Sequence, residues 1–338
     1  MSNKRAVLVP ITAVAVAVLA FVGCLFTGAA DIAAGDVLAA LTGGSGKPSV
    51  DYIVMNTRLP AAITALLCGM ALSIAGLLMQ TTFDNPLAGP SIMGISSGAS
   101  LGVAIVMLAL TTTATAWSQS AVLAGALAGA LGVLALLTML ASAVRSATML
   151  LIAGILIGYL TSSGISLLNF FATRESIHTY VIWGLGSFSA VTMDDIPLFA
   201  VLVILPALAS FLYSKTLNAL LLGSRYAASV GVNVPAARRG LLLLSGILTA
   251  FATAWCGPIG FIGIVVPHIA RMAVRSSDHR LLLPASALIG AAIGVLCLWI
   301  CVSPGAVGIL PVNAVTPIIG APIILYIILK RRSIFYFN

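Results

Sequence analysis

Long runs of apolar residues without a charged side chain recur along the whole chain, and they limit its possible folds more than any other feature. A run of about 20 such residues crosses a bilayer as a helix, because a helix satisfies its own backbone hydrogen bonds where water is absent. Composition agrees, since 61% of the 338 residues are hydrophobic and 7% are charged, against about a quarter charged in a soluble domain. The sequence therefore predicts an all-α polytopic membrane protein, with one transmembrane domain over residues 1–338.

About ten transmembrane helices are expected. The expected spans cover residues 7–29, 59–81, 92–110, 121–141, 148–170, 194–213, 239–257, 259–273, 282–303 and 313–329. The first apolar stretch runs past 20 residues, whereas the apolar core of a secretory signal has about 7 to 15. We therefore expect an uncleaved first span.

Basic residues are divided unequally between the two sides of these spans. With a cytoplasmic N-terminus, all of the 16 Lys and Arg residues lie on the inner side except Lys47, Arg58 and Arg174. This asymmetry follows the positive-inside rule and places both termini in the cytoplasm. The net charge of +8 is thus explained by topology, so lipid is the expected surrounding and no nucleic-acid partner is expected.

Ionisable and nucleophilic side chains form no pattern typical of an enzyme or a metal site. The histidines and cysteines are scattered or lie in apolar segments, so neither a catalytic residue, a metal site nor a cofactor bound by this chain is expected. No acid falls in the middle of an expected span, which disfavours a proton or sodium relay. An ion-coupled secondary transporter of a small solute stays open as the alternative, because Asn85 and nearby serines in broken helices could bind an ion.

A polar, Pro-rich interruption over residues 76–99 separates the second and third expected spans. Non-helical backbone at membrane depth is tolerated only where protein or a water-filled path covers its polar groups. We therefore interpret the segment as the wall or gate of a pathway, with an ordinary tight loop as the alternative. The expected path-lining residues are Gln80, Ser96, Ser97, Ser163, Ser166 and Asn169.

A second polar stretch, about residues 215–238, lies on the expected cytoplasmic side. Its small residues Gly223, Ala227 and Gly231 recur every four positions, so another surface could approach closely. The stretch predicts a docking site for a cytoplasmic partner, with a solvated loop as the alternative.

Several motifs occur in order along nearly the entire chain. They are Arg58-Leu59-Pro60, Met79-Gln80 with Asn85-Pro86-Leu87-Ala88, Leu150-Leu151-Ile152-Ala153-Gly154, Trp183-Gly184 with Gly186-Ser187-Phe188, Gly257-Pro258-Ile259-Gly260-Phe261-Ile262-Gly263 with Val266-Pro267-His268-Ile269-Ala270-Arg271, and Gly320-Ala321-Pro322. Together they resemble the FecCD family of ABC permeases, which includes importers of ferric siderophores, haem and cobalamin. The resemblance favours a ferric siderophore, with haem next and cobalamin third.

The resemblance implies a type II ABC importer permease in the bacterial inner membrane, paired with a second permease that is usually an identical copy. It also implies two cytoplasmic ABC ATPases, which use ATP and Mg, and an external substrate-binding protein. The chain itself would then be a transport subunit and not an enzyme.

The resemblance also assigns roles to residues. The implied gate residues are Asn85, Leu87, Ala147 and Thr148. The residues implied at the ATPase contact are Gly223, Arg225, Ala227 and Gly231. Those implied for docking the binding protein are Arg58 and, as a helper, Arg174.

The chain departs from the family pattern at some of these places. Ser224 and Arg225 replace the usual acidic pair, so the ATPase contact is expected to be charged differently. Ile309 and Asn313 replace a glutamate and a glycine around Leu-Pro-Val. We interpret these changes as a variant docking surface, with an inactive or heterodimeric permease as the alternative.

Overall fold

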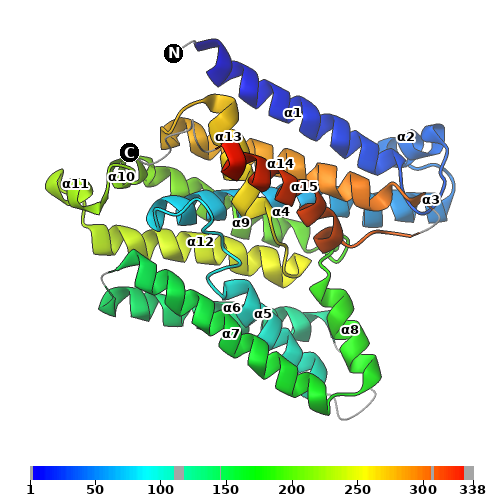
Figure 1. Ribbon diagram of the computed structural model, residues 1–338. Helices are drawn as coiled ribbons and strands as arrows, with labels where there is room; N and C mark the ends of the chain where they lie inside the picture. Colours follow the sequence, from blue (N-terminus) through cyan, green and yellow to red (C-terminus); the bar gives the residue numbers. More distant parts are fainter. Residues whose placement is uncertain (1–2, 110–117, 145, 306–307, 331–338) are drawn as a thin grey trace.

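The computed structural model describes residues 3–109, 118–144, 146–305 and 308–330, and their regular structure is helical. The elements are α1 (Asn3–Phe26), α2 (Ala34–Thr42), α3 (Pro48–Ile53), the π-helix η1 (Val54–Arg58), α4 (Leu59–Thr82), α5 (Ile95–Ala104), the π-helix η2 (Ile105–Ala109), α6 (Gln119–Ala143), α7 (Ala147–Phe171), α8 (Arg174–Gly184), α9 (Ile196–Leu212), α10 (Ser214–Leu220), α11 (Ser224–Ser229), α12 (Val234–Cys256), α13 (Ile262–Val274), α14 (His279–Val302) and α15 (Val312–Lys330). The start of α1 and the end of α15 lie towards the end of the bundle that carries α10 and α11, whereas α2 and α3 lie at the opposite end (Figure 1). This arrangement agrees with the even number of spans expected.

The helices at the expected spans differ in length. Among the described residues, six helical stretches are long and apolar enough to cross a membrane, and a seventh forms if α9 and α10, bent by 58°, count as one. The stretches Ile95–Ala109, Ile262–Val274 and Val312–Tyr326 are apolar but shorter. The 13 residues of α13 cover about 20 Å, two-thirds of a hydrocarbon core of about 30 Å. The six long stretches, the bent pair and the three shorter helices together correspond to the ten expected spans.

Helix α4 is the core of the bundle, buried along most of its length and in contact with α9, α12, α13 and α14. Glycines permit the closest approaches. A Cβ at Gly69 would lie 2.1 Å from the carbonyl oxygen of Gly290, and one at Gly76 would lie 1.7 Å from that of Gly263. Small residues at such crossings let helix backbones touch, which is how helices associate in lipid. Helices α1 and α7 lie at opposite edges of the bundle (Figure 1).

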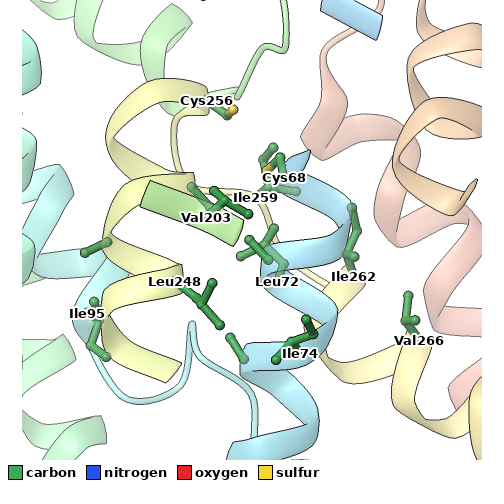
Figure 2. Close-up of a cluster of buried hydrophobic side chains, with 14 of the residues drawn as sticks. Cys68, Leu72, Ile74, Ile95, Val203, Leu248, Cys256, Ile259, Ile262 and Val266 are labelled. Carbon is green, nitrogen blue, oxygen red and sulfur yellow. The ribbon is translucent and has the colours of Figure 1, made fainter. Parts of the chain in front are cut away.

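A buried apolar cluster fixes the start of α13 against α4. Figure 2 shows Cys68 and Leu72 of α4 gathered with Cys256 of α12 and Ile259 of the following loop. All five cysteines are free and buried, which agrees with their interpretation as small packing residues. The cluster holds the non-helical residues 257–261 in place, so the path of the chain into α13 is fixed by packing.

Candidate functional site

The loop between α4 and α5, residues 83–94, is folded by Asn85. The amide nitrogen of Asn85 donates to Gln80 O (3.1 Å), and that of Leu87 donates to Asn85 Oδ1 (2.9 Å), which is a turn typical of Asn. Leu87 stands at the tip with 43% of its side chain exposed. We call residues 83–94 the gate loop. Its geometry makes Asn85 the organiser of the loop and Leu87 the side chain that it presents.

Gln80 does not line a path, because its side chain is 0% exposed. Its Nε2 donates to Ile264 O (3.0 Å), and its Oε1 accepts from Arg271 Nη1 (2.6 Å). Both partners belong to α13. The path-lining role expected for Gln80 is corrected to a link between α4 and α13.

His268 of α13 holds the gate loop from the other side. Its Nε2 lies 2.8 Å from Pro86 O, and since a carbonyl oxygen only accepts, Nε2 carries the proton and donates. A Cβ at Gly89 would lie 2.6 Å from Ile264 Cγ1, so the loop packs closely on α13. The hydrogen bond of His268 and the packing at Gly89 thus attach the gate loop to α13.

Ser96 and Ser97, both expected at the path, open onto a cavity of about 300 Å³. Its lining residues are Ser91, Ser96, Ser97, Ser100, Pro258, Ile259, Gly260 and Asn313. Ser96 Oγ lies 3.2 Å from Thr253 Oγ1, which joins α5 to α12. We call this space the serine cavity. Its lining offers hydroxyl, amide and backbone groups and no charged side chain among the described residues.

Asn313 is a site residue that the analysis of the sequence did not propose. Its Oδ1 accepts from Gly260 N (3.1 Å), and its Nδ2 donates to Gly184 O (3.1 Å) and to Pro258 O. One side chain thus joins the end of α8, the loop 257–261 and the start of α15 beside the serine cavity. The available signal was the asparagine at a position where the family pattern has glycine.

The residues expected on α7 do not form one site. Ala147 is the first residue of the helix, Thr148 is exposed beside it, and Ser146 caps the helix by accepting from Met149 N. Asn169 lies near the other end of this 25-residue helix, roughly 30 Å away. Its buried Oδ1 has no hydrogen-bond partner in the described part of the chain. Ser163 and Ser166 are both exposed on the same helix and do not line the serine cavity.

The expected ATPase contact, residues 215–238, contains α10, the short helix α11 and the start of α12. Gly223 (φ +94°) and Gly231 (φ +88°) flank α11 with backbone conformations that favour glycine, so they shape its turns. Arg225 is exposed on α11, whereas Ala227 is 0% exposed and faces the bundle. The direct contact expected for Ala227 is corrected to packing. We call α10 and α11 the coupling segment.

Arg58 is buried, with 7% of its side chain exposed, although an outer docking role was expected. Its Nη1 donates to Leu25 O (2.7 Å) and its Nη2 to Ala30 O (2.6 Å), which ties the end of α1 to the start of α4. The docking role expected for Arg58 is corrected to a structural one, because its guanidinium donates to carbonyl oxygens of the chain itself. Arg174, the first residue of α8, is exposed.

Asn218 connects the coupling segment to α14. Its Nδ2 donates to Asp278 Oδ1 (2.7 Å), and its Oδ1 accepts from His279 N (2.8 Å). The hydrogen bonds from Asn218 and from Arg280 N stabilise the carboxylate, so the pKa of Asp278 is below its usual value. No pattern in the sequence indicated this group, because its members come from separate segments.

The sequence signature of the FecCD transport family matches residues 16–330. The chain belongs to this family. FecCD relatives include the hemin transport system permease protein HmuU of Yersinia pestis, 34% identical over 83% of this chain and 84% of the relative. Another is the vitamin B12 import system permease protein BtuC of Escherichia coli O9:H4 (strain HS), 33% identical over 84% of this chain and 86% of the relative.

A solved structure is similar to this chain over nearly its whole length. It is an inward-facing conformation of a transporter assigned to the metal-chelate type of ABC transporter, with a TM-score of 0.83, 28% identity, and coverage of 96% of this chain and 98% of that one. The fold is therefore that of a type II ABC importer permease. The chain is a multi-pass membrane subunit of an ABC transporter and is not itself an enzyme.

Proposed function

We propose that this chain is the permease of an ATP-driven importer of a metal chelate, with a ferric siderophore as its cargo. The observation that carries the proposal is the match over 96% of the chain to a transporter of the metal-chelate type. Relatives named for hemin and vitamin B12 support the broader class of bulky metal chelates. The family assignment favours this function over an ion-coupled carrier.

The serine cavity supports a weakly held cargo. Hydroxyl and amide groups line it without a charged side chain among the described residues, so it offers no strong anchor for a metal or a carboxylate. A bulky chelate would pass such a surface once a partner released it. The gate loop, held by α13, would close this path on the cytoplasmic side.

The proposed assembly contains two copies of this permease, two cytoplasmic ATPases using ATP and Mg, and an external binding protein, in a bacterial inner membrane. The exposed apolar residues Leu156, Leu160 and Leu167 on α7 support burial of that face by lipid or by the second copy. Exposed Arg225 supports the placement of the ATPase on the coupling segment.

The test is uptake into proteoliposomes that contain the chain with its cognate ATPase and binding protein. Labelled ferric siderophore, haem and cobalamin are supplied outside, with ATP, a non-hydrolysable ATP analogue or no nucleotide inside. A further arm supplies a proton or sodium gradient without ATP. We expect accumulation of the siderophore only with hydrolysable ATP.

The other outcomes are equally informative. ATP-driven accumulation of haem or cobalamin alone would keep the importer and replace the cargo. Accumulation driven by the ion gradient without ATP would contradict the proposal and establish a carrier.

A further inference from the structure

We propose that Asn218, His279 and Thr81 form a relay that transmits movement of the coupling segment to the gate loop. This inference rests on the proposed function, because it explains how work at an ATPase reaches the gate. The three are positioning residues, since none of them lines the serine cavity. They belong to α10, α14 and α4, which are far apart in sequence.

The first step of the relay joins α10 to α14. Asn218 binds two neighbouring groups at the start of α14, the Asp278 carboxylate and the backbone N–H of His279. The Asp278 carboxylate accepts only, so it orients the Asn218 amide with Nδ2 towards it and Oδ1 towards His279. These two hydrogen bonds of the Asn218 side chain couple a shift of α10 to the first turn of α14.

The second step joins α14 to α4 through the imidazole of His279. Its Nδ1 lies 2.9 Å from Asn218 Oδ1, and because that oxygen accepts, Nδ1 carries the proton and donates. The neutral ring then presents Nε2 as an acceptor, and Thr81 Oγ1 donates to it over 2.8 Å. Both His279 and Thr81 are buried, where water does not compete for these hydrogen bonds.

The third step joins Thr81 to the gate loop through the backbone. Thr81 lies one residue before the end of α4, and its carbonyl oxygen accepts from Asp84 N (3.4 Å). The carbonyl of the preceding residue, Gln80, accepts from Asn85 N (3.1 Å). Asp84 holds a left-handed backbone conformation (φ +47°), which few residues other than glycine adopt. A displacement of Thr81 therefore reaches the turn that orients Asn85 and Leu87.

The matched control lies next to Thr81. Thr82 Oγ1 donates its hydrogen to Leu78 O (2.7 Å), one helical turn earlier, whereas Thr81 Oγ1, which lies 3.1 Å from Leu77 O, donates its single hydrogen to His279 Nε2. Both side chains are buried in the same helix end. Thr81→Val thus removes the relay contact, Thr82→Val removes a comparable hydroxyl without it, and Thr81→Ser keeps the hydroxyl.

The experiment measures cargo accumulated per ATP hydrolysed in proteoliposomes of the complete complex. Losing one buried hydrogen bond corresponds to about a three- to tenfold change, so we expect Thr81→Val to lower the ratio by about that factor while ATP hydrolysis stays close to the wild-type rate. Thr81→Ser and Thr82→Val should keep the wild-type ratio. A residue with a merely structural role would lower uptake and hydrolysis together.

Asn218→Leu tests the same relay from its other end, at a part-buried position near the edge of the bundle. We expect the same fall in the ratio of cargo to ATP. The double variant Asn218→Leu with Thr81→Val should have a ratio no lower than that of the poorer single variant, because both residues act in one relay. Equal effects of Thr81→Val and Thr82→Val, or additive losses in the double variant, would overturn the relay. Wild-type complexes that accumulate no cargo with ATP would instead refute the proposed function.

Discussion

Nη1 of Arg271 donates a 2.6 Å hydrogen bond to Oε1 of Gln80, in the interior between α13 and α4. A buried guanidinium in an apolar bundle is costly unless hydrogen bonds satisfy it. Gln80 also donates to Ile264 O, so one side chain holds α13 at its first turn and near its C-terminal end. The short α13, which carries His268 and the gate-loop contacts, is thus fixed to the core helix by polar groups.

Replacing Gln80 by methionine should lower the free energy of unfolding by about 1.5–3 kcal/mol, because a hydrogen bond to a charged group is lost in a buried place. Methionine conserves the side-chain volume, so a cavity does not contribute. Thermal unfolding in detergent measures the effect, with Thr82→Val as a milder buried control. Equal melting temperatures for Gln80→Met and the wild-type protein would show that the link carries no stability.

Asn313→Ala should destabilise the bundle beside the serine cavity by about 1–3 kcal/mol, since three backbone groups, of Gly184 and of the loop 257–261, lose their partner. Asn169→Ala is the matched control, because Asn169 Oδ1 is buried without a hydrogen-bond partner in the described residues. Melting temperatures of the two variants give the comparison. A loss for Asn169→Ala as large as that for Asn313→Ala would contradict the assigned role.

Apolar runs and the unequal distribution of basic residues were enough to predict an all-α membrane bundle. Both signals can be read from short stretches of sequence, because each span needs its own apolar run and each loop its own charges. They did not predict that residues 259–261 are non-helical and that α13 begins at Ile262, since that depends on how residues 257–261 pack on α4. The polar type of Gln80 suggested that it lines a path, and the family resemblance implied that Arg58 docks the binding protein. Both side chains instead meet backbone carbonyls of distant segments. Asn218 and His279 were missed for the same reason, as 60 residues separate Asn218 from Asp278.

Arg225→Glu should weaken binding of the ATPase about fivefold or more, because it reverses the exposed charge of α11 that a complementary partner surface would match. The affinity of the purified permease for its ATPase is the readout, at low and at high salt. The difference from wild type should shrink as salt screens the charges. Stronger binding of Arg225→Glu would mean that the partner surface is basic.

Arg58 and Arg174 should respond in opposite ways to removal of their charge. Arg58→Ala leaves Leu25 O and Ala30 O without their donors, so it should lower the melting temperature, with a cost of about 1.5–3 kcal/mol. Arg174→Ala, at an exposed position on α8, should leave the melting temperature unchanged and weaken binding of the external protein. Melting curves and affinity for the binding protein are measured on both variants. The guanidinium of Arg58 is already bonded to carbonyl oxygens of the chain, so its loss should affect stability and not docking. An Arg58→Ala variant with a wild-type melting temperature and weaker binding of the external protein would refute this structural role and support docking by Arg58.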